Sequence, residues 1–219
     1  MKIIAINGSP RKKTNTATMC NKFLEGAKSV SSDVETEIIN LFDLNYKGCI
    51  SCFGCKRKEG NTYGKCIVKD ELQPVLEKVS IADGVVFGSP IYFGDITGQL
   101  HSFFERLLFP FSTYEEGYKK IAPKKMPTAM IYTMNVTEDL MKKFGYDVHL
   151  SNMESIIASI FRKPEIIYAF NTYQFSDYNK YKMEIFSEKV KAEHKRTQFP
   201  IDCQNAFEAG KRMIMQIQK

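Results

Sequence analysis

Residues 7–16 hold the side chains whose types and spacing point most clearly to chemistry. They follow the apolar stretch 3–6 and precede an amphipathic segment, so the sequence predicts a turn between a strand and a helix. Backbone N–H groups at a helix start, together with the helix dipole, attract anions. Side chains that can complete a phosphate site in this turn are Ser9, Arg11, Lys12, Lys13, Asn15 and Thr16.

The order of residues in this turn excludes the commonest phosphate loops. A P-loop requires G-x-x-x-x-G-K-[ST] and a dinucleotide loop requires G-x-G-x-x-G, and residues 7–16 match neither. Receiver domains place carboxylates at the end of the first strand, where this chain has Asn7 and Gly8. Two interpretations remain: a site for the phosphate of flavin mononucleotide (FMN), or an ordinary polar turn without a ligand.

A second loop with ligand-binding character follows the apolar run 84–88. It contains aromatic side chains, and glycines that let a planar ring approach the backbone. The alternative is a turn whose aromatic residues only cover the core, but two such loops after two strands favour a ligand. Candidate contacts of a flavin ring in this loop are Tyr92, Phe93 and Gly94.

The elements that must position these loops alternate along the chain. Helical patterns separate the apolar runs that we predict as strands, which span 2–7, 34–41, 84–88, 128–133 and 166–170. Such alternation predicts an α/β fold with a parallel sheet covered by helices on both faces. We expect a flavodoxin-like three-layer sandwich with a five-stranded sheet of order 2-1-3-4-5, which places its ligand where the first and third strands end.

Helix starts are marked by capping residues. Asp70 is placed to cap a helix that carries apolar residues on one face. Ser151 and Glu154 have the spacing of a capping box, which predicts a helix start at residue 151.

Length and composition fit one domain. The chain has 219 residues, a net charge of +6 and 43% hydrophobic residues, and it lacks an apolar stretch of the roughly 18 residues that span a membrane. We expect a cytoplasmic protein without nucleic-acid or membrane partners, because an anionic cofactor explains the moderate positive charge equally well. We predict a single domain over 1–219, with a core of about 1–175 and a helical extension of about 176–219.

Four of the six cysteines form a dense group, whose spacing in a cytosolic protein indicates redox chemistry or metal binding before disulfides. Three thiols at Cys-x2-Cys-x2-Cys spacing suit an iron–sulfur cluster, whereas structural zinc typically uses two separated pairs. The remaining interpretation is a set of free thiols beside the ligand pocket. The group, called the cysteine loop below, contains Cys49, Cys52, Cys55 and Cys66; the isolated Cys20 and Cys203 are expected in the core.

Three separated segments give the chain a family resemblance. Residues 8–16, residues 88–94 and the tripeptide 104–106 resemble the NADPH-dependent FMN reductases, over roughly residues 1–110. The cysteine loop followed by Asp70 resembles the iron–sulfur flavoprotein branch of that family. The resemblance implies a flavodoxin-like fold, bound FMN, electron transfer through the flavin, and a homodimer or homotetramer.

By position, the resemblance also assigns the site. It places the phosphate on the first loop and the flavin ring on the second, and it implies a third contact loop after the fourth strand. The implied contacts are Ser9, Arg11, Asn15, Thr16, Pro90, Ile91, Tyr92, Phe93, Gly94, Thr133, Met134 and Asn135.

We therefore predict an FMN-dependent NAD(P)H oxidoreductase that passes electrons from a reduced nicotinamide to a quinone, a flavin or another small acceptor. No catalytic residue is assigned, because the flavin performs the chemistry. The alternatives are an iron–sulfur flavoprotein, a flavodoxin-type electron carrier and a flavin-free binding module with the same fold.

The spacing within the cysteine loop decides our prediction about metal. Ten residues separate Cys55 from Cys66, more than we expect of cluster-bearing relatives, and residues 56–58 are cationic and predict a solvated, mobile segment. We predict FMN without a [4Fe-4S] cluster. If a cluster is present, its candidate ligands are Cys49, Cys52, Cys55 and Cys66.

Overall fold

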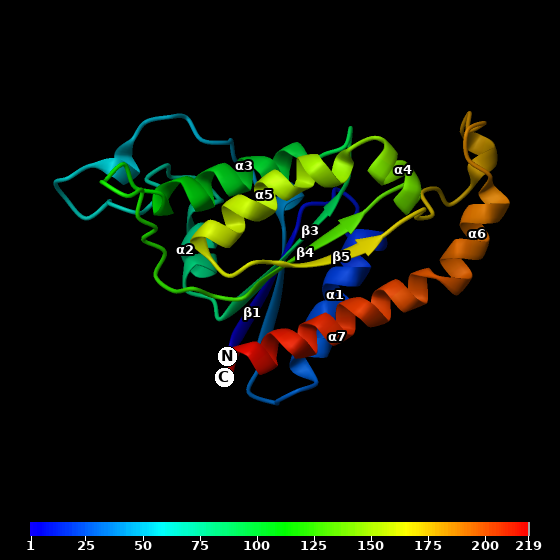
Figure 1. Cartoon of the computed structure of the whole chain (residues 1–219), viewed down its shortest axis with the longest axis horizontal. Helices are drawn as coiled ribbons and strands as arrows, with labels where there is room; N and C mark the ends of the chain where they lie inside the picture. Colours follow the sequence, from blue (N-terminus) through cyan, green and yellow to red (C-terminus); the bar gives the residue numbers. More distant parts are fainter. Residues whose placement is uncertain (219) are drawn as a thin grey trace.

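The computed structural model describes residues 1–218, which form a five-stranded parallel sheet between two layers of helices (Figure 1). The strand order is β2-β1-β3-β4-β5, and each neighbouring pair is parallel. The predicted fold class and strand order are confirmed. The strands are β1 (Lys2–Asn7), β2 (Glu35–Asn40), β3 (Gly84–Pro90), β4 (Thr128–Thr133) and β5 (Glu165–Ala169).

Helices α2, α3 and α5 cover one face of the sheet, and α1 and α7 cover the other (Figure 1). Short 3-10 turns lie at 41–43, 54–56, 109–111 and 178–180. The helices are α1 (Asn15–Lys28), α2 (Gln73–Ser80), α3 (Gly98–Leu108), α4 (Glu138–Lys143), α5 (Tyr146–Ile160), α6 (Glu188–Thr197) and α7 (Phe199–Ile217).

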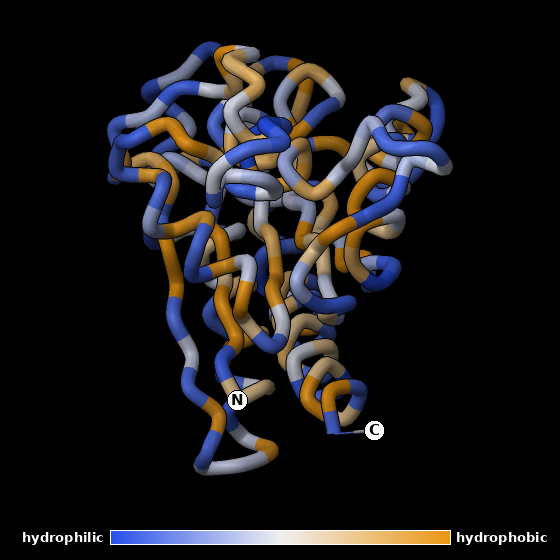
Figure 2. The backbone as a smooth tube through the Cα atoms, turned by 90° about the vertical axis from the view of Figure 1, so that its left-hand side faces the viewer, coloured by the Kyte–Doolittle hydropathy of each residue, from blue (hydrophilic) through white to orange (hydrophobic). Residues whose placement is uncertain are grey.

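The central strands are buried on both faces, which explains their continuous apolar sequences. Along β3, Val85 and Phe87 pack into the core beneath α2, α3 and α5, while Val86 packs into the core beneath α1 and α7. This alternation follows from the two-residue period of a strand. Figure 2 shows the resulting hydrophobic runs in the strand segments and more mixed colouring in the helices.

Helix α7 packs on α1 at a distance that only glycine permits. A Cβ atom at Gly26 would lie 1.9 Å from the carbonyl oxygen of Phe207, and one at Gly210 would lie 2.0 Å from the carbonyl oxygen of Phe23. The apolar stripe of α7 thereby closes one face of the sheet. Its buried members are Cys203, Ala206, Ala209, Met213 and Ile214, and Cys20 of α1 lies in the same core, as the sequence predicts for both isolated cysteines.

The predicted start of α5 is wrong. The helix begins at Tyr146, after Gly145 with a φ of 69°, a left-handed conformation that glycine adopts without strain. Ser151 therefore lies inside the helix, where its hydroxyl donates to the carbonyl oxygen of Val148 at 2.7 Å. Ser151 and Glu154 have the spacing of a capping box without standing at a helix end.

Among the residues described, none of the helices has the length and apolar character that a membrane span requires.

Candidate cofactor site

A groove of about 100 Å³ lies at the C-terminal ends of β1, β3 and β4. The three predicted loops meet in its lining, together with Thr172 and Gln174 from the segment after β5. The strand order explains this convergence, because parallel neighbouring strands end at the same edge of the sheet. The predicted residues that line the groove are Ser9, Arg11, Asn15, Thr16, Pro90, Ile91, Tyr92, Thr133, Met134 and Asn135.

Hydrogen bonds within the first loop hold its turn in place. The backbone N–H of Ser9 donates to Oδ1 of Asn7 at 3.1 Å, and the N–H of Arg11 donates to Oγ of Ser9 at 3.1 Å. The N–H of Gly8 donates to the carbonyl oxygen of Gly88 at 2.8 Å, which joins this loop to β3. A Cβ atom at Gly8 would lie 2.9 Å from Cβ of Leu100, so the close approach requires glycine.

Residues of the first loop also contact the segment after β5. Nη1 of Arg11 donates to the carbonyl oxygen of Gln174 at 2.5 Å, and Nδ2 of Asn15 donates to that of Tyr173 at 3.0 Å. The hydroxyl of Thr16 is buried, 2.7 Å from the hydroxyl of Thr133. Sequence reasoning missed the part played by residues 172–174. Their position after β5, which ends beside β4, could have indicated that they contact the groove.

The second loop, residues 90–94, divides into a part that lines the groove and a tight turn. Tyr92 lines the groove and is 47% exposed. Phe93 and Gly94, with φ of 53° and 83°, form a tight turn in which the Tyr92 N–H donates to the carbonyl oxygen of Asp95 at 2.8 Å. Phe93 is fully exposed, and among the described residues that line the groove neither Phe93 nor Gly94 appears, although both were predicted as ring contacts. A Cβ atom at Gly94 would lie 2.8 Å from the Tyr146 ring, which explains the glycine.

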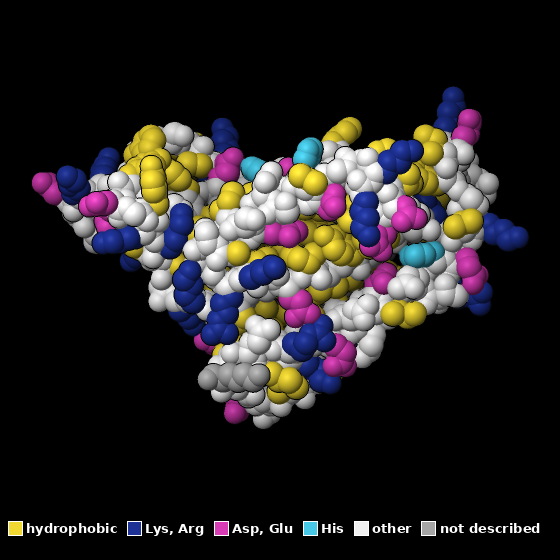
Figure 3. Space-filling model, viewed as in Figure 1, with side chains coloured by type: hydrophobic (Ala, Val, Ile, Leu, Met, Phe, Trp, Pro, Cys, Tyr) yellow, Lys and Arg dark blue, Asp and Glu magenta, His cyan; other side chains and the backbone are white. Residues whose placement is uncertain are grey.

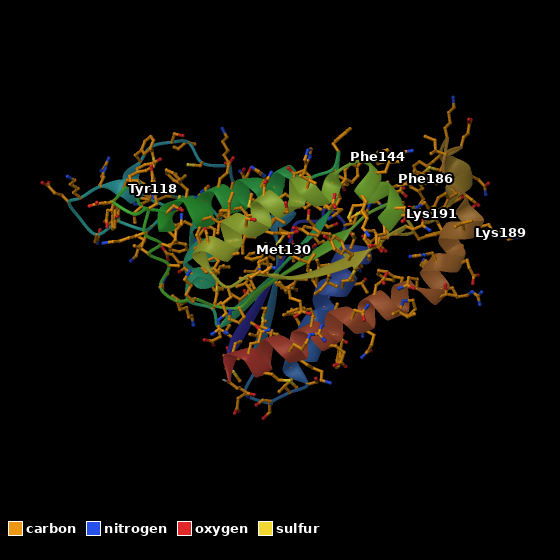
Figure 4. All side chains as sticks on the ribbon, viewed as in Figure 1. Tyr118, Met130, Phe144, Phe186, Lys189 and Lys191 are labelled. Carbon is orange, nitrogen blue, oxygen red and sulfur yellow. The ribbon has the colours of Figure 1, made fainter. Side chains whose placement is uncertain are left out.

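The third loop is anchored by a buried lysine of α6. Nζ of Lys191 donates to the carbonyl oxygen of Asn135 and to Oδ1 of Asn171, both at 2.9 Å. Burial lowers the pKa of Lys191 to about 8. The same ammonium lies 4.7 Å from the centroid of the Phe186 ring, and Figure 4 shows the two side chains close together. Thr172 adds a hydroxyl bond to the carbonyl oxygen of Met134 at 3.1 Å.

Arg106 ties the cysteine loop to α3. Its buried guanidinium donates to both carboxylate oxygens of Asp70. Burial acts to raise the pKa of Asp70, but the hydrogen bond and charge of Arg106 outweigh it and hold that pKa below its ordinary value. Oδ1 of Asp70 also accepts from the N–H of Leu72 at 3.1 Å and of Gln73 at 3.3 Å. Leu72 is the N-cap residue of α2, so the carboxylate predicted to cap this helix lies two residues before the cap position. The other acceptors of the guanidinium are the carbonyl oxygens of Lys47 and Val68, and Sγ of Cys66.

The four thiols of the cysteine loop line one narrow cavity of about 20 Å³. Cys49 and Cys52 are exposed, whereas Cys55 is buried, and this burial raises the pKa of the Cys55 thiol. In residues 1–218, no three His, Cys, Asp or Glu side chains converge closely enough to hold a metal ion. Cys49, Cys52, Cys55 and Cys66 thus share one wall, although no three such side chains of the described residues surround a single ion.

The prediction of a solvated segment after Cys55 is wrong at Lys56. Its ammonium donates to three carbonyl oxygens and lies 4.4 Å from the centroid of the Phe109 ring. The acceptors are Phe109, Pro110 and Ser112, just beyond the end of α3, where carbonyl groups attract a cation. Arg57 and Lys58 are exposed, in agreement with the prediction.

The fold and the groove define a flavodoxin-like protein with a ligand site at the strand ends. Residues 1–160 match the sequence model of the NADPH-dependent FMN reductase family. The chain belongs to this family.

Curated relatives include iron–sulfur flavoproteins. One from Methanocaldococcus jannaschii is 38% identical over 106 residues, which cover 48% of this chain and 51% of the relative. One from Archaeoglobus fulgidus is 40% identical over 106 residues, which cover 48% of each. The chain spans about half the length of the curated relatives it matches.

Solved structures with a similar fold include reductases. An NAD(P)H:quinone oxidoreductase from Methanothermobacter marburgensis superposes with a TM-score of 0.70 at 14% identity, covering 97% of this chain and 98% of the other. An azoreductase from Bacillus anthracis superposes with a TM-score of 0.67 at 14% identity, covering 96% of this chain and 99% of the azoreductase. At such identities the likeness establishes the fold alone.

Proposed function

We propose that this chain binds FMN in the groove and passes electrons from NADH or NADPH to a small acceptor such as a quinone or a free flavin. The observation that carries the proposal is the convergence of three loops, separately predicted as cofactor contacts, in one groove. Family membership supports the same cofactor and reaction class.

The phosphate end of the cofactor would lie at the start of α1. Backbone N–H groups of the helix start, the hydroxyls of Ser9 and Thr16, and the charge of Arg11 are the groups that would bind it. No Asp or Glu among residues 1–218 contributes to the groove lining, so an anion there meets no carboxylate. This end of the groove therefore suits a terminal monophosphate.

The ring end would lie along Pro90, Ile91 and Tyr92. These residues line the groove, and Tyr92 is half exposed, so the site stays open to a second reactant. When bound, FMN supplies the redox chemistry, taking up a hydride equivalent and releasing its electrons to an acceptor. The residues of the chain bind and orient the cofactor, and we assign none as a catalytic acid or base.

Competitive titration of the FMN-free protein with FMN, FAD and riboflavin tests the proposal. We expect FMN to bind most tightly, because the groove offers its charged groups to a terminal phosphate. FAD binding as tight as FMN binding would contradict it. Steady-state oxidation of NADH and NADPH with a quinone acceptor tests the reaction, and a flavin-loaded protein without turnover would instead support an electron carrier.

A second candidate function, a two-cofactor electron relay, is favoured by one observation: the four thiols line one cavity. The thiols have the right chemistry for an iron–sulfur cluster, but ten residues separate Cys55 from Cys66, more than we expect of a cluster protein, so we propose FMN without a cluster. The test is an iron and acid-labile sulfide assay on anaerobically purified protein. Stoichiometric iron and sulfide, lost when Cys49, Cys52 and Cys55 are replaced by serine, would establish the relay.

We further propose that the protein is a cytoplasmic homodimer or homotetramer. Exposed apolar side chains beside the groove and in the cysteine loop favour a subunit contact; they include Phe93, Ile50 and Phe53. The cysteines of the described chain are free thiols, which suits a reducing compartment. Light scattering on the purified protein tests the assembly, and a monomer at micromolar concentration would contradict it.

A further inference from the structure

Lys191 of α6 is a buried cation whose hydrogen bonds all go to uncharged groups. The residue is 1% exposed, and the three oxygens that accept from its ammonium are two backbone carbonyls and one side-chain amide. Among the described residues no carboxylate pairs with it, since burial is the sole cause that lowers its pKa to about 8. Lysines are almost never fully buried without a charged partner. The hydrogen bonds of Lys191 therefore leave its charge unexplained.

The acceptors of Lys191 connect it to the wall of the cofactor groove. The carbonyl oxygens of Asn135 and Thr172 lie 2.9 Å and 3.5 Å from its Nζ, and both residues line the groove. The third acceptor is Oδ1 of Asn171, the neighbour of Thr172 in the chain, at 2.9 Å. The ammonium is thus one residue away from the groove, although Lys191 is not among the described residues that line it.

Positive charge reaches the groove from two elements. Arg11 brings it from the first loop, and Lys191 brings it from α6, behind the loop that follows β4. Inside a protein the effective dielectric constant is lower than in water, so a buried charge acts over a longer distance. The phosphate of FMN would therefore attract this ammonium without touching it.

The other charged or titratable groups nearby do not neutralise Lys191. On α4, α6, α7 and the segment before α6 they are Glu138, Glu184, Glu188, His194, Lys195 and Asp202. Glu138 is paired with Lys142 at 2.6 Å, and Glu188 accepts from the hydroxyl of Tyr173 at 3.0 Å. Figure 3 shows basic and acidic side chains interspersed over one face of the molecule, where solvent screens them. Neither solvent nor a carboxylate screens the buried ammonium of Lys191.

We propose that Lys191 is a positioning residue for the cofactor, whose ammonium holds the third loop and supplies a fixed positive charge that favours the phosphate of FMN. The inference rests on the proposed function and deepens it, because selection of an anionic flavin then depends on a residue outside the groove. A nearby anion stabilises the charged form of a lysine. FMN binding should therefore raise the pKa of Lys191, and the protein should take up protons above about pH 8.

Calorimetric titration of the flavin-free full chain with FMN measures this uptake. The titration is run at pH 8.5 in two buffers that differ in their enthalpy of ionisation. If the charge of Lys191 contributes tenfold to FMN affinity, the chain should take up roughly half a proton for each FMN bound. Riboflavin has the same ring without the phosphate, and its binding should take up almost none.

Two variants separate the charge of Lys191 from its hydrogen bonds. Lys191→Met removes both, whereas Lys191→Gln keeps an amide donor and removes only the charge. Each should weaken FMN binding roughly tenfold at pH 7, riboflavin binding less than threefold, and each should abolish the proton uptake. Lys189→Met, an exposed position of the same helix, is the control and should change FMN binding less than twofold. Thermal melting shows whether each variant folds, and the uptake by the wild type needs no variant.

Equal losses of FMN and riboflavin affinity in Lys191→Met would show that the residue acts on the loop alone, and would overturn the proposal. FMN binding to the wild type without proton uptake, or with the same uptake in Lys191→Met, would overturn it as well. A wild-type chain that binds neither FMN nor riboflavin would contradict the proposed function together with this inference. Failure of the proposed function and failure of the role of Lys191 are therefore distinguishable.

Discussion

The guanidinium of Arg11 hydrogen-bonds to the backbone in the structure, and in our proposal it also binds the phosphate of FMN. Its guanidinium donates to the carbonyl oxygen of Gln174 while lining the groove, so the segment after β5 helps to position the charge. A guanidinium has five donors, so this bond leaves others for a phosphate.

Arg11→Ala should weaken FMN binding roughly ten- to a hundredfold, because a charge-assisted hydrogen bond is worth about 1.5–3 kcal/mol. Riboflavin, which has no phosphate, should lose much less affinity. Flavin fluorescence titration measures both. Lys13→Ala is the matched control, since Lys13 is an exposed neighbour outside the groove lining. An equal loss for FMN and riboflavin would show that Arg11 acts through the fold.

Lys191 makes stability depend on pH in a predictable direction. Its pKa is lowered from 10.5 to about 8 in the folded chain, so between these values the unfolded chain binds more protons. The free energy of unfolding should therefore rise with pH in this interval, by up to about 1.4 kcal/mol per pH unit from this residue. Below pH 8 the cost of burying the charge is fully present.

The pH effect is measured as a difference between wild type and Lys191→Met in urea unfolding at about pH 7.5, 9 and 10. The wild type should gain stability relative to the variant as the pH rises. Lys189→Met is the control, because Lys189 is exposed on the same helix and points away from the β4 loop (Figure 4). A pH-independent difference for Lys191→Met would contradict the prediction.

At the scale of elements, the pair of Arg106 and Asp70 joins α3, the start of α2 and the cysteine loop. Asp70→Asn should lower the free energy of unfolding by about 3 kcal/mol, because it leaves a buried guanidinium without its counter-charge. Urea unfolding measures the loss. Glu25→Gln, which breaks the exposed pair of Lys22 and Glu25, should have little effect.

The same pair has a signature at low pH. The pKa of Asp70 is lowered in the folded state, so its contribution is complete above the unfolded-state pKa and is lost as the pH falls through the folded-state value. The stability difference between wild type and Asp70→Asn should therefore shrink in acid. A difference that stays constant down to about pH 3 would contradict this account.

The sheet was predictable because its strands carry long apolar runs that only a doubly covered sheet explains, as in β3. The start of α5 was not, because Ser151 and Glu154 imitate a cap and nothing in the sequence marks Gly145 as left-handed. Lys56 was misjudged for a similar reason. A cation followed by two others suggests solvent, whereas the acceptors of Lys56 lie more than fifty residues further along the chain.

The candidate site was predictable where short local motifs carry it and unpredictable where distant backbone does. Ser9, Arg11 and Thr16 stand in a recognisable turn and do line the groove. Gln174 and Lys191 contact the loops only because β5 and α6 lie beside β4. A spacing rule cannot detect carbonyl oxygens used as acceptors, since every residue has one.

At the scale of the whole molecule, the crossing of α1 and α7 limits which residues fit. Gly210→Ala should lower stability by about 1–3 kcal/mol, because the new Cβ would lie 2.0 Å from a backbone oxygen and the helices would have to separate. Thermal or urea unfolding measures the loss. Gly98→Ala is the control, since a Cβ there meets no atom of the described chain within 4 Å. Equal effects would contradict a packing origin.

The same crossing has a consequence for how the chain is made. Gly26 and Gly210 belong to the same helix crossing although 184 positions separate them along the chain. A ribosome adds about 5–20 residues per second, so roughly 10–40 s pass between the synthesis of the two glycines. Until α7 emerges, the apolar side of α1 and of the adjoining strands has no cover. For most of its translation the nascent chain therefore exposes apolar surface that α7 later buries. Chaperones bind surfaces of this kind.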